Sequence, residues 1–485
     1  MERGWTPRLW ATACIVVVVV AAAARIAAAM NDLWLDEILA LGAACHLSSA
    51  VDVFTGLHSE INHHLYTLYL FLLRPENNWF DCRIPSLVAG VGAVVVAGAI
   101  GRRRSRACGF FAMLLLGSSY VMILYSSEAR GYALAVFFAL AAFHLLDRYL
   151  ETSVKGDRPI FVGTKIGTVP WPLVAGFSVC SILGFLSQLT FVSFYLATLA
   201  WSLYRLKGEP KGRLVRTMLC CHAAPLLFLA TFYVVDIRHI TGIGGTPSSL
   251  LRSCIAAPAW AMGSPSQAVA QLAASIVAAA IIVAGIWLLR RDRLDLCVFF
   301  LGAIVVFPVL LIVVRGSDVI YVRYFVIAIA FLLLLFSFVL AGLCERGPGG
   351  KAACAVLLAL FVTSNGLHAA NLFEHGRGRY SEAIRYIVEH SERSPVTIGS
   401  DHDSRVATVL AFYGLGDENA VYYPRNAWPK GGPEWVICHK ESFEDPTPPA
   451  AVIVDEAHNE YEFVKSFPSA PLSGLHWFLY HNRSG

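Results

Sequence analysis

Apolar residues along this chain gather into runs long enough to cross a lipid bilayer, and such runs recur from the first residues to about position 371. Because a helix needs about 20 predominantly apolar residues to cross the hydrocarbon core, the pattern predicts about eleven membrane-spanning helices. We expect them near residues 9–29, 84–101, 107–124, 131–149, 171–188, 190–206, 215–235, 268–290, 294–314, 323–343 and 351–371.

Other apolar stretches are too short to cross. Residues 36–47 and 65–73, between the first two spans, read as helices that lie in the plane of the membrane interface. After about residue 371 the pattern becomes that of a soluble domain, with helices over 380–392 and 404–413. Short apolar runs between Gly- and Pro-containing turns predict strands at 396–398, 420–423, 435–438 and 451–454.

Composition agrees with this division. Of the 485 residues, 56% are hydrophobic and 15% are charged, whereas a soluble domain keeps about a quarter of its residues charged. We therefore predict a polytopic α-helical membrane protein over residues 1–371, with a first outer loop at 30–83. A small extracytoplasmic α/β domain is expected over 372–485.

Lysine and arginine clusters predict the orientation, because cytoplasmic loops carry an excess of both. The clusters alternate with the spans, so the N-terminus is expected in the cytoplasm, and an odd number of spans puts the C-terminal domain outside. The first span reads as a retained anchor that directs export, and Arg25 near its outer end is expected to snorkel toward the interface. The clusters contain Arg3, Arg8, Arg102, Arg103, Arg104, Arg106, Arg148, Lys155, Arg158, Lys165, Arg205, Lys207, Lys211, Arg213, Arg216, Arg290, Arg291, Arg293, Arg346 and Lys351.

The 12 cysteines do not indicate a disulfide framework. Several of them fall inside predicted spans, where Cys acts as a small hydrophobic residue: Cys14, Cys180, Cys220, Cys221, Cys297 and Cys354. Cys45 and Cys82 share the first outer loop and are a possible disulfide pair in an oxidising compartment. The spacing of Cys and His does not indicate a zinc site.

Three outer segments carry most of the polar chemistry. Charged groups at a membrane boundary are costly unless they are partnered or useful, and all three segments are predicted at one membrane face. We therefore expect their charged side chains to converge on one cavity. The segments are residues 30–83, 125–132 and 315–323.

Motifs in these segments resemble a known family. They are Asp36-Glu37 after the first span, Asn62-His63-His64-Leu65-Tyr66, Arg83-Ile84-Pro85-Ser86-Leu87 and Glu128-Ala129-Arg130-Gly131-Tyr132. In order and spacing they resemble the C-type membrane glycosyltransferases, which use polyprenyl-phosphate-linked sugars and include the protein mannosyltransferases and the lipid A aminoarabinose transferase. His64 stands where that family often has Pro. The later spans match in hydropathy and in Arg323-Tyr324.

The resemblance implies C-type glycosyltransferase architecture and a hexosyl- or pentosyltransferase that inverts the anomeric carbon, with Asp36 as the general base. Reaction chemistry favours the same residues: a carboxylate takes the proton of an acceptor hydroxyl, and arginines stabilise the departing phosphate. Arg130 and Arg323 are the candidates for the phosphate. Further candidates are Glu37 for catalysis and His63, His64, Glu128, Tyr132, Asn62 and Glu60 for substrate binding.

These residues also have structural interpretations. Asp36 fits the first turn of a helix, where the helix dipole favours an acid. Adjacent helical positions point about 100° apart, so Glu37 is expected to be a structural partner rather than to share a cavity with Asp36. The two histidines fit polar interface positions. Glu128 and Arg130 fit the ends of two spans or an ion pair with each other.

Two other classes of function account for part of the pattern. A transporter would show paired, broken spans with ionisable residues near the midplane, and a scaffold or a lipid- or glycan-binding assembly protein would not need the Asp36, Arg130 and Arg323 set. The expected partners are a polyprenyl-phosphate sugar donor, membrane lipids and a glycan, glycolipid or protein acceptor, without nucleic acid. No metal is assigned, although Asp36, Glu37 and Glu60 offer ligands for a divalent cation. A role in cell-envelope glycan biosynthesis at a bacterial inner membrane is expected.

Overall fold

The structure is a computed structural model of the chain, and it describes residues 6–59, 61–74, 78–154, 170–240, 249–316, 319–392, 394–414 and 420–483. Its contacts divide the chain into two compact units. The membrane unit comprises Met1–Ile26, Leu47–Arg74 and Cys82–Gly366. The sheet unit comprises Ala27–His46, Pro75–Asp81 and Leu367–Gly485.

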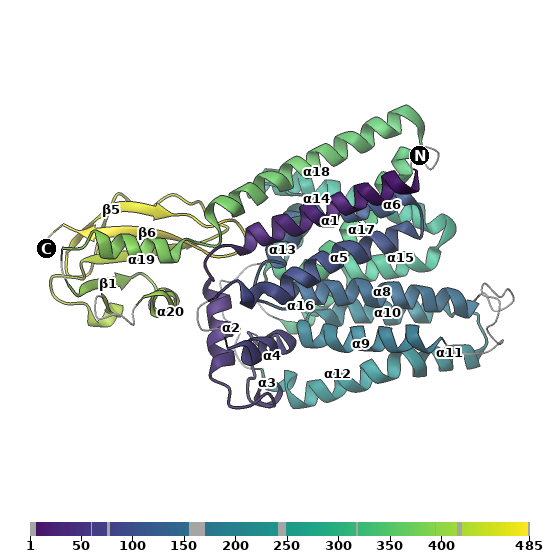
Figure 1. Cartoon of the computed structure of the whole chain (residues 1–485), viewed down its shortest axis with the longest axis horizontal. Coiled ribbons are helices and arrows are strands. Elements are labelled where there is room, and N and C mark those ends of the chain that lie inside the picture. Colours follow the sequence, from purple (N-terminus) through teal and green to yellow (C-terminus); the bar gives the residue numbers. More distant parts are fainter. Residues whose placement is uncertain are drawn as a thin grey trace. The chain divides into compact units, whose positions relative to one another are not determined.

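The membrane unit is a bundle of long helices that run side by side (Figure 1). Its α-helices are α1 (Pro7–Ala29), α3 (Asp52–Thr55), α4 (His64–Leu73), α5 (Ile84–Arg102), α6 (Arg106–Ser118), α7 (Tyr120–Tyr125), α8 (Tyr132–Val154), α9 (Trp171–Ser187), α10 (Phe191–Arg205), α11 (Lys211–Thr217), α12 (Ala223–Val235), α13 (Leu250–Ala261), α14 (Ala268–Asp292), α15 (Leu294–Leu301), α16 (Phe307–Arg315), α17 (Val326–Cys344) and α18 (Gly347–His375), of which α1 and α18 end in the sheet unit. Short 3₁₀ turns lie at Asp81–Arg83, Ile237–His239 and Val322–Phe325, and π turns at Met218–His222 and Gly302–Val306. Helix α17 is apolar all round and buried along almost its whole length, so it forms the centre of the bundle.

The predicted spans all coincide with helices. Within the described residues, eight helices are long and apolar enough to cross a membrane. The predicted spans at 107–124, 171–188 and 190–206 correspond to α6 with α7, α9 and α10, which are shorter. The multi-pass architecture is therefore confirmed, and the count of eleven crossings stays a prediction.

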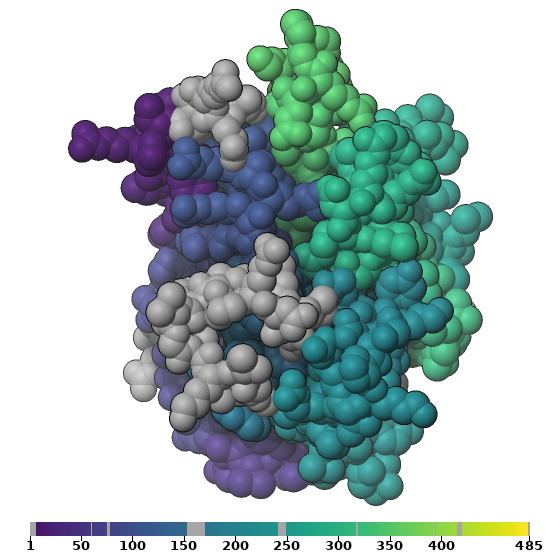
Figure 2. Space-filling view, turned by 90° about the vertical axis from the view of Figure 1, so that its right-hand side faces the viewer, coloured from purple at the N-terminus to yellow at the C-terminus, as the bar shows by residue number. Residues whose placement is uncertain are grey.

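The basic clusters that the structure describes gather at one end of the bundle. Trp10 at the start of α1 donates its indole N–H to the carbonyl of Arg106 at 2.9 Å, and the Arg102 guanidinium lies 4.8 Å from its ring centroid. Arg293, between α14 and α15, lies 2.8 Å from Asp147 of α8. Figure 2 faces this end, where purple, blue and green segments from distant parts of the sequence lie together. Arg3, Lys155, Arg158 and Lys165 lie outside the described residues.

Arg293 is the centre of an ion-pair network at this end. Its guanidinium lies 2.7 Å from Glu151 and 3.1 Å from Asp295, in addition to the contact with Asp147. Arg103 contacts Asp147 and Glu151 as well, at 3.1 and 2.8 Å. The carboxylates of Asp147 and Asp295 are 8% and 6% exposed, and buried charges of this kind persist only when they are paired. The network therefore ties the α5–α6 turn, α8 and the α14–α15 turn together.

The third predicted span is broken at Ser119, between α6 and α7. A break within an apolar bundle leaves backbone groups that must find other partners. The Ser119 hydroxyl accepts a bond from the Met122 N–H at 3.5 Å, and the Tyr120 N–H donates to the side-chain oxygen of Asn365 at 2.8 Å. These two backbone N–H groups next to the break thus have hydrogen-bond partners.

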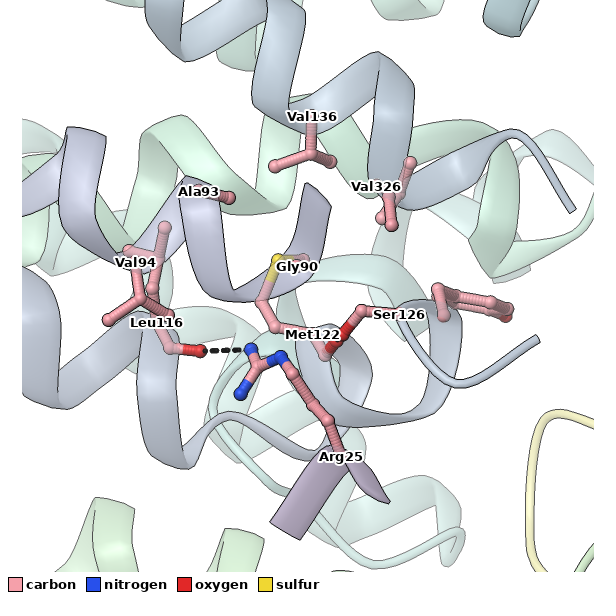
Figure 3. A pocket seen from close by; sticks show the side chains of 11 residues that line it. Arg25, Gly90, Ala93, Val94, Leu116, Met122, Ser126, Val136 and Val326 are labelled. Carbon is pink, nitrogen blue, oxygen red and sulfur yellow. Dashed lines mark hydrogen bonds between the residues drawn. The ribbon is translucent and has the colours of Figure 1, made fainter. Parts of the chain in front are cut away.

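Arg25 donates hydrogen bonds to backbone carbonyl groups at the same break. Its guanidinium donates to the carbonyl of Leu116 at the end of α6 at 3.1 Å (Figure 3). It also donates to the carbonyls of Gly117 at 3.2 Å and Ala21 at 3.0 Å. The side chain is 1% exposed. The snorkelling expected of Arg25 is therefore wrong: the partial negative charge of a helix C-terminus holds the guanidinium inside the bundle.

The sheet unit contains a six-stranded mixed sheet in the order β2-β1-β3-β6-β5-β4. Its strands are β1 (Val396–Ser400), β2 (Ala420–Tyr422), β3 (Trp435–Glu441), β4 (Val452–Val454), β5 (Glu460–Phe467) and β6 (Leu475–Asn482). Strand β1 pairs in parallel with β2 and β3, and the remaining pairs are antiparallel. The unit also contains α2 (Leu35–Cys45), α19 (Tyr380–Glu389) and α20 (Asp403–Tyr413), and Figure 1 shows α19 lying along the sheet.

The structure confirms helices over 36–47 and 65–73, as α2 and α4, and both predicted helices and all four predicted strands of the C-terminal region. That α2 and α4 lie in the membrane interface stays a prediction. Strands β5 and β6 were not predicted. All 12 cysteines are free, so Cys45 and Cys82 do not form the disulfide considered from the sequence.

Gly90 of α5 gives a test of the packing around Arg25. A Cβ atom at this position would lie 2.3 Å from the Cβ of Ser126 and 3.0 Å from the Nε of Arg25. We expect Gly90→Ala to lower the free energy of unfolding by about 1–3 kcal/mol, because the backbone must shift to relieve the overlap. Thermal unfolding in detergent or nanodiscs measures the change.

Gly366→Ala is the matched control. Gly366 is also helical, and nothing lies within 4 Å of the position that its Cβ would take. Alanine there should leave the unfolding temperature unchanged or raise it, since Ala favours a helix over Gly by about 1 kcal/mol. Equal unfolding temperatures for both variants would contradict the packing described for Gly90.

Candidate active site

The first turn of α2 carries the pair Asp36-Glu37, within the sheet unit. The Glu37 side chain is fully buried, and its Oε2 accepts a hydrogen bond from the Trp34 N–H at 3.2 Å. Glu37 therefore satisfies one of the amide groups that a helix leaves open at its N-terminus. Asp36 is half-buried. The two carboxylates have different surroundings, as the helical angle between adjacent positions predicts.

His63 occupies the N-cap position of α4, in the membrane unit, and is buried. Its Nδ1 lies 2.8 Å from the carbonyl oxygen of Ser187, the last residue of α9. Since a carbonyl only accepts, Nδ1 carries the proton, and Nε2 is the acceptor nitrogen of the neutral ring. The ring also meets Tyr132 edge-on, with centroids 5.1 Å apart.

Two predicted arginines act on this histidine. Burial lowers the pKa of His63 well below its usual value, and the positive charges of Arg130 and Arg323 lower it further. His63 is therefore neutral at physiological pH. His63 and Arg130 both contact Tyr132, and the consecutive residues Ser187 and Gln188 bond to His63 and to the Arg323 carbonyl. The membrane unit therefore brings four of the predicted residues together. We call His63, Arg130, Tyr132 and Arg323 the arginine site.

Arg130 lies in the turn between α7 and α8 and is 5% exposed. Its Nη2 lies 3.4 Å from the hydroxyl of Tyr132, and its backbone N–H bonds to the Glu128 carbonyl at 2.8 Å. The Ser86 hydroxyl donates to the Arg130 carbonyl at 3.0 Å. Glu128 is fully buried, and its charge and that of Arg323 both act on Tyr125. The whole turn is thus held inside the protein.

Arg323 reaches the arginine site from the turn before α17. Its guanidinium lies over the ring of Tyr321, 4.3 Å from the centroid, and its carbonyl accepts a bond from the Gln188 amide at 3.5 Å. Ser187 and Gln188 are consecutive residues at the end of α9. This helix end therefore contacts both His63 and Arg323.

His64 lies apart from its neighbour and contacts an acid that the sequence analysis did not select. Its Nε2 lies 2.9 Å from Asp236, and Nδ1 of His58 lies 2.7 Å from the same carboxylate. Asp236 is 1% exposed and follows α12. The sequence did contain a signal for Asp236, since it is an acidic residue at the end of an apolar span. The pairs connect the first outer loop to the end of α12.

The hydrogen bonds of Asn62 have a structural role. Its amide group donates to the carbonyls of Val53 and Leu57, at 2.8 and 2.9 Å, and so shapes the loop before α4. Glu60 lies outside the described residues. Across the described part of the chain, no three His, Cys, Asp or Glu side chains are arranged to hold a metal ion.

In sequence, the chain matches no protein-family profile and no curated protein. Among solved structures, the crystal structure of ArnT from Cupriavidus metallidurans bound to undecaprenyl phosphate is similar with a TM-score of 0.53 and 14% identity, over 98% of both chains. The apo state of the same protein has a TM-score of 0.46 and 13% identity, over 97% of this chain and 98% of that one.

The first of these comparisons shows that the chain has the ArnT fold along its whole length. ArnT is the aminoarabinose transferase of the group that the sequence motifs resemble. The resemblance is therefore confirmed at the level of the fold. At this identity the comparison shows the fold alone, and the chemistry has to be argued from the residues of this chain.

The neutral state of His63 predicts how the free energy of unfolding changes with pH. The unfolded chain takes up a proton at this position below about pH 6.5, whereas the folded chain does not, because its pKa is lowered. The unfolded state then binds more protons, so stability falls as the pH falls, by about 1.4 kcal/mol per pH unit below that value. We expect His63→Gln to lose this part of the acid sensitivity.

The measurement is thermal unfolding of the wild type and the variant at pH 7.5 and pH 5.5. The loss of stability between the two pH values should be smaller in His63→Gln. His390→Gln is the control, since His390 is exposed and its substitution should leave the pH dependence unchanged. A wild-type loss that persists undiminished in His63→Gln would contradict a neutral, buried His63.

Proposed function

We propose that this protein is a membrane glycosyltransferase that moves a sugar from a polyprenyl-phosphate donor to an acceptor hydroxyl at the extracytoplasmic face. The observation that carries the proposal is the arginine site, within a fold shared with ArnT. The ArnT structure of that comparison is bound to undecaprenyl phosphate. A lipid-linked phosphate is the kind of donor that suits a buried Arg130 and a half-buried Arg323 at one end of an apolar bundle.

Arg130 and Arg323 are proposed to hold the donor phosphate. Guanidinium groups present paired donors that match phosphate oxygens and stay charged at all relevant pH values. Within the described residues, both are held at their positions by contacts with tyrosines, Tyr132 and Tyr321 respectively. His63 adds a neutral ring whose Nε2 accepts a hydrogen bond, which suits a sugar or acceptor hydroxyl rather than the anion itself.

Asp36 is proposed as the general base. Its carboxylate takes the proton of the acceptor hydroxyl while the acceptor oxygen forms a bond to the anomeric carbon. The bond from that carbon to the phosphate oxygen breaks, and its electron pair leaves with the polyprenyl phosphate. Direct displacement of this kind inverts the anomeric configuration. Half-buried Asp36 is the carboxylate of the pair that a substrate can reach, whereas Glu37 is committed to the helix terminus.

The remaining candidate residues are proposed to shape the site. Asn62 orders the loop before α4, His64 connects that loop to Asp236, and Glu128 lies inside the turn that carries Arg130. The proposed setting is a bacterial inner membrane, with the N-terminus in the cytoplasm and the sheet unit outside. The acceptor is a glycan, a glycolipid or a protein.

A non-catalytic scaffold or lipid-binding assembly protein is the competing function. Such a protein can bind polyprenyl phosphate through the arginine site without transferring sugar. The separating observation is turnover, and it depends on Asp36. A transporter is less well supported, because it requires ionisable groups along a path through the bundle, whereas the arginine site is built from turns at helix ends.

Asp36→Asn tests the base. In membranes supplied with labelled polyprenyl-phosphate sugars, we expect transfer by this variant to fall by about 10²- to 10⁴-fold, the usual contribution of a general base. Asp52→Asn is the matched control, since Asp52 also lies in the first turn of an outer-loop helix and accepts the Ser49 N–H at 2.7 Å. Full activity of Asp36→Asn would remove this residue from the chemistry.

Arg130→Gln tests the donor site separately from catalysis. Loss of a charge-assisted contact should weaken binding of undecaprenyl phosphate by about 10- to 100-fold, measured by ligand titration in detergent. Arg104→Gln is the control. Arg104 follows the last residue of α5 and lies over Phe338 in the second half of α17, whereas Arg323 precedes the first residue of α17. Unchanged binding by Arg130→Gln would contradict the phosphate assignment.

A further inference from the structure

Helix α2, which carries Asp36, belongs to the sheet unit together with the residues that precede it. Residues Ala27–His46 share this unit with Leu367–Gly485 although more than 300 residues separate the two segments in sequence, as the contact between Asp32 and Ser381 illustrates with a separation of 349. Three sets of hydrogen bonds hold the segment before α2, and α2 itself packs against α20.

The first set is made by Asp32, four residues before Asp36. Its Oδ2 accepts the Ser381 N–H at 2.8 Å, and its Oδ1 accepts the Ser381 hydroxyl at 3.0 Å. Ser381 is the second residue of α19, whose own N-cap residue, Arg379, makes no side-chain capping bond. Asp32 thus supplies the acceptor that the N-terminus of α19 needs, from the far end of the sequence.

The second set comes from the turn before α19. Arg377 is fully buried and donates to the Ala28 carbonyl at 3.2 Å and to the Asn31 side chain at 3.1 Å. Gly376 has a φ of +60°, and a Cβ there would lie 2.9 Å from the Cβ of Asn31. Glycine is therefore required for this turn to approach the chain that leads into α2.

The third set is made by α20. Tyr413, its last residue, donates its hydroxyl to the Leu33 carbonyl at 3.0 Å. Leu33 and Trp34 are both buried, and Trp34 is the N-cap residue of α2 that Glu37 binds. Each residue from Asn31 to Trp34 therefore takes part in at least one of these hydrogen bonds. Asp36 follows Trp34 by two residues.

We propose that the sheet unit positions the general base: Asp32 and Tyr413 hold the first turn of α2 so that the Asp36 carboxylate keeps its orientation toward the acceptor hydroxyl. This inference rests on the proposed function, because it assigns to the C-terminal region a role in that same reaction. Asp32 and Tyr413 are positioning residues. Arg130 and Arg323 belong to the membrane unit, so loosening α2 lowers the rate of transfer and leaves donor binding unchanged.

The test compares Asp32→Ala, Asp32→Asn and Tyr413→Phe with two matched controls in the same unit. Asp455→Ala removes a carboxylate that accepts bonds from Ala457 and Asn459 in its own turn and from Tyr461 in β5. Tyr422→Phe removes a hydroxyl that bonds to Asp403. Neither control residue contacts α2 or the residues before it through these bonds.

Two readouts are measured on the full-length protein. In sugar transfer, Asp32→Ala should lower kcat by about 10- to 100-fold while the KM for the donor changes by less than about twofold, since small displacements of a reacting group cost rate rather than binding. Asp32→Asn keeps one acceptor oxygen and should recover part of kcat. In hydrogen exchange, the amides of α2 should exchange about tenfold faster in Asp32→Ala and in Tyr413→Phe than in the wild type.

The outcomes separate this inference from the proposed function. If the wild type transfers sugar and Asp32→Ala has the same kcat as Asp455→Ala, the positioning role is wrong. Unchanged exchange of α2 in Asp32→Ala and Tyr413→Phe also overturns it, whatever the activity. If the wild type transfers no sugar from any donor, the proposed function fails, and the positioning role falls with it even where exchange shows that Asp32 holds α2.

Discussion

At Gly131 the backbone of the α7–α8 turn passes so close to the end of α9 that a Cβ atom would lie 2.0 Å from the Ser187 carbonyl oxygen. That oxygen also accepts the Nδ1–H of His63. Three separate segments therefore meet at one acceptor, and the arginine site depends on this contact. A side chain at Gly131 would push the turn away, and the guanidinium of Arg130 with it, from the ring that Arg130 and Arg323 both influence.

Much of the fold follows from hydrophobic length and period, and these are local properties of the sequence. The spans, both interface helices and four strands were predicted in this way. Strand β5, Glu460–Phe467, has a partly alternating pattern and was missed although it offered a signal. Strand β6, Leu475–Asn482, is buried almost throughout because it lies between β3 and β5, so it has no alternation to detect.

The candidate site was predictable in its residue types and much less so in its contacts. A charged residue at the end of an apolar span indicates a functional site, and Arg130 and Arg323 were predicted on this ground. The partner of His58 and His64, by contrast, lies 178 residues beyond His58 in the sequence, and only folding brings Asp236 to them. The same is true of the contacts around Asp36: nothing local indicates that the segment Ala27–His46 shares a unit with the C-terminal sheet.

The buried guanidinium of Arg25 has a consequence for how the chain is made. Its carbonyl partners Leu116 and Gly117 lie 91 and 92 residues further along and are synthesised later. A charged side chain within an apolar span is costly unless it is partnered, and α1 is made before the carbonyl groups that Arg25 binds. The order of synthesis is thus also an order of assembly, because the guanidinium in α1 gains these carbonyl partners only once α6 has packed against it.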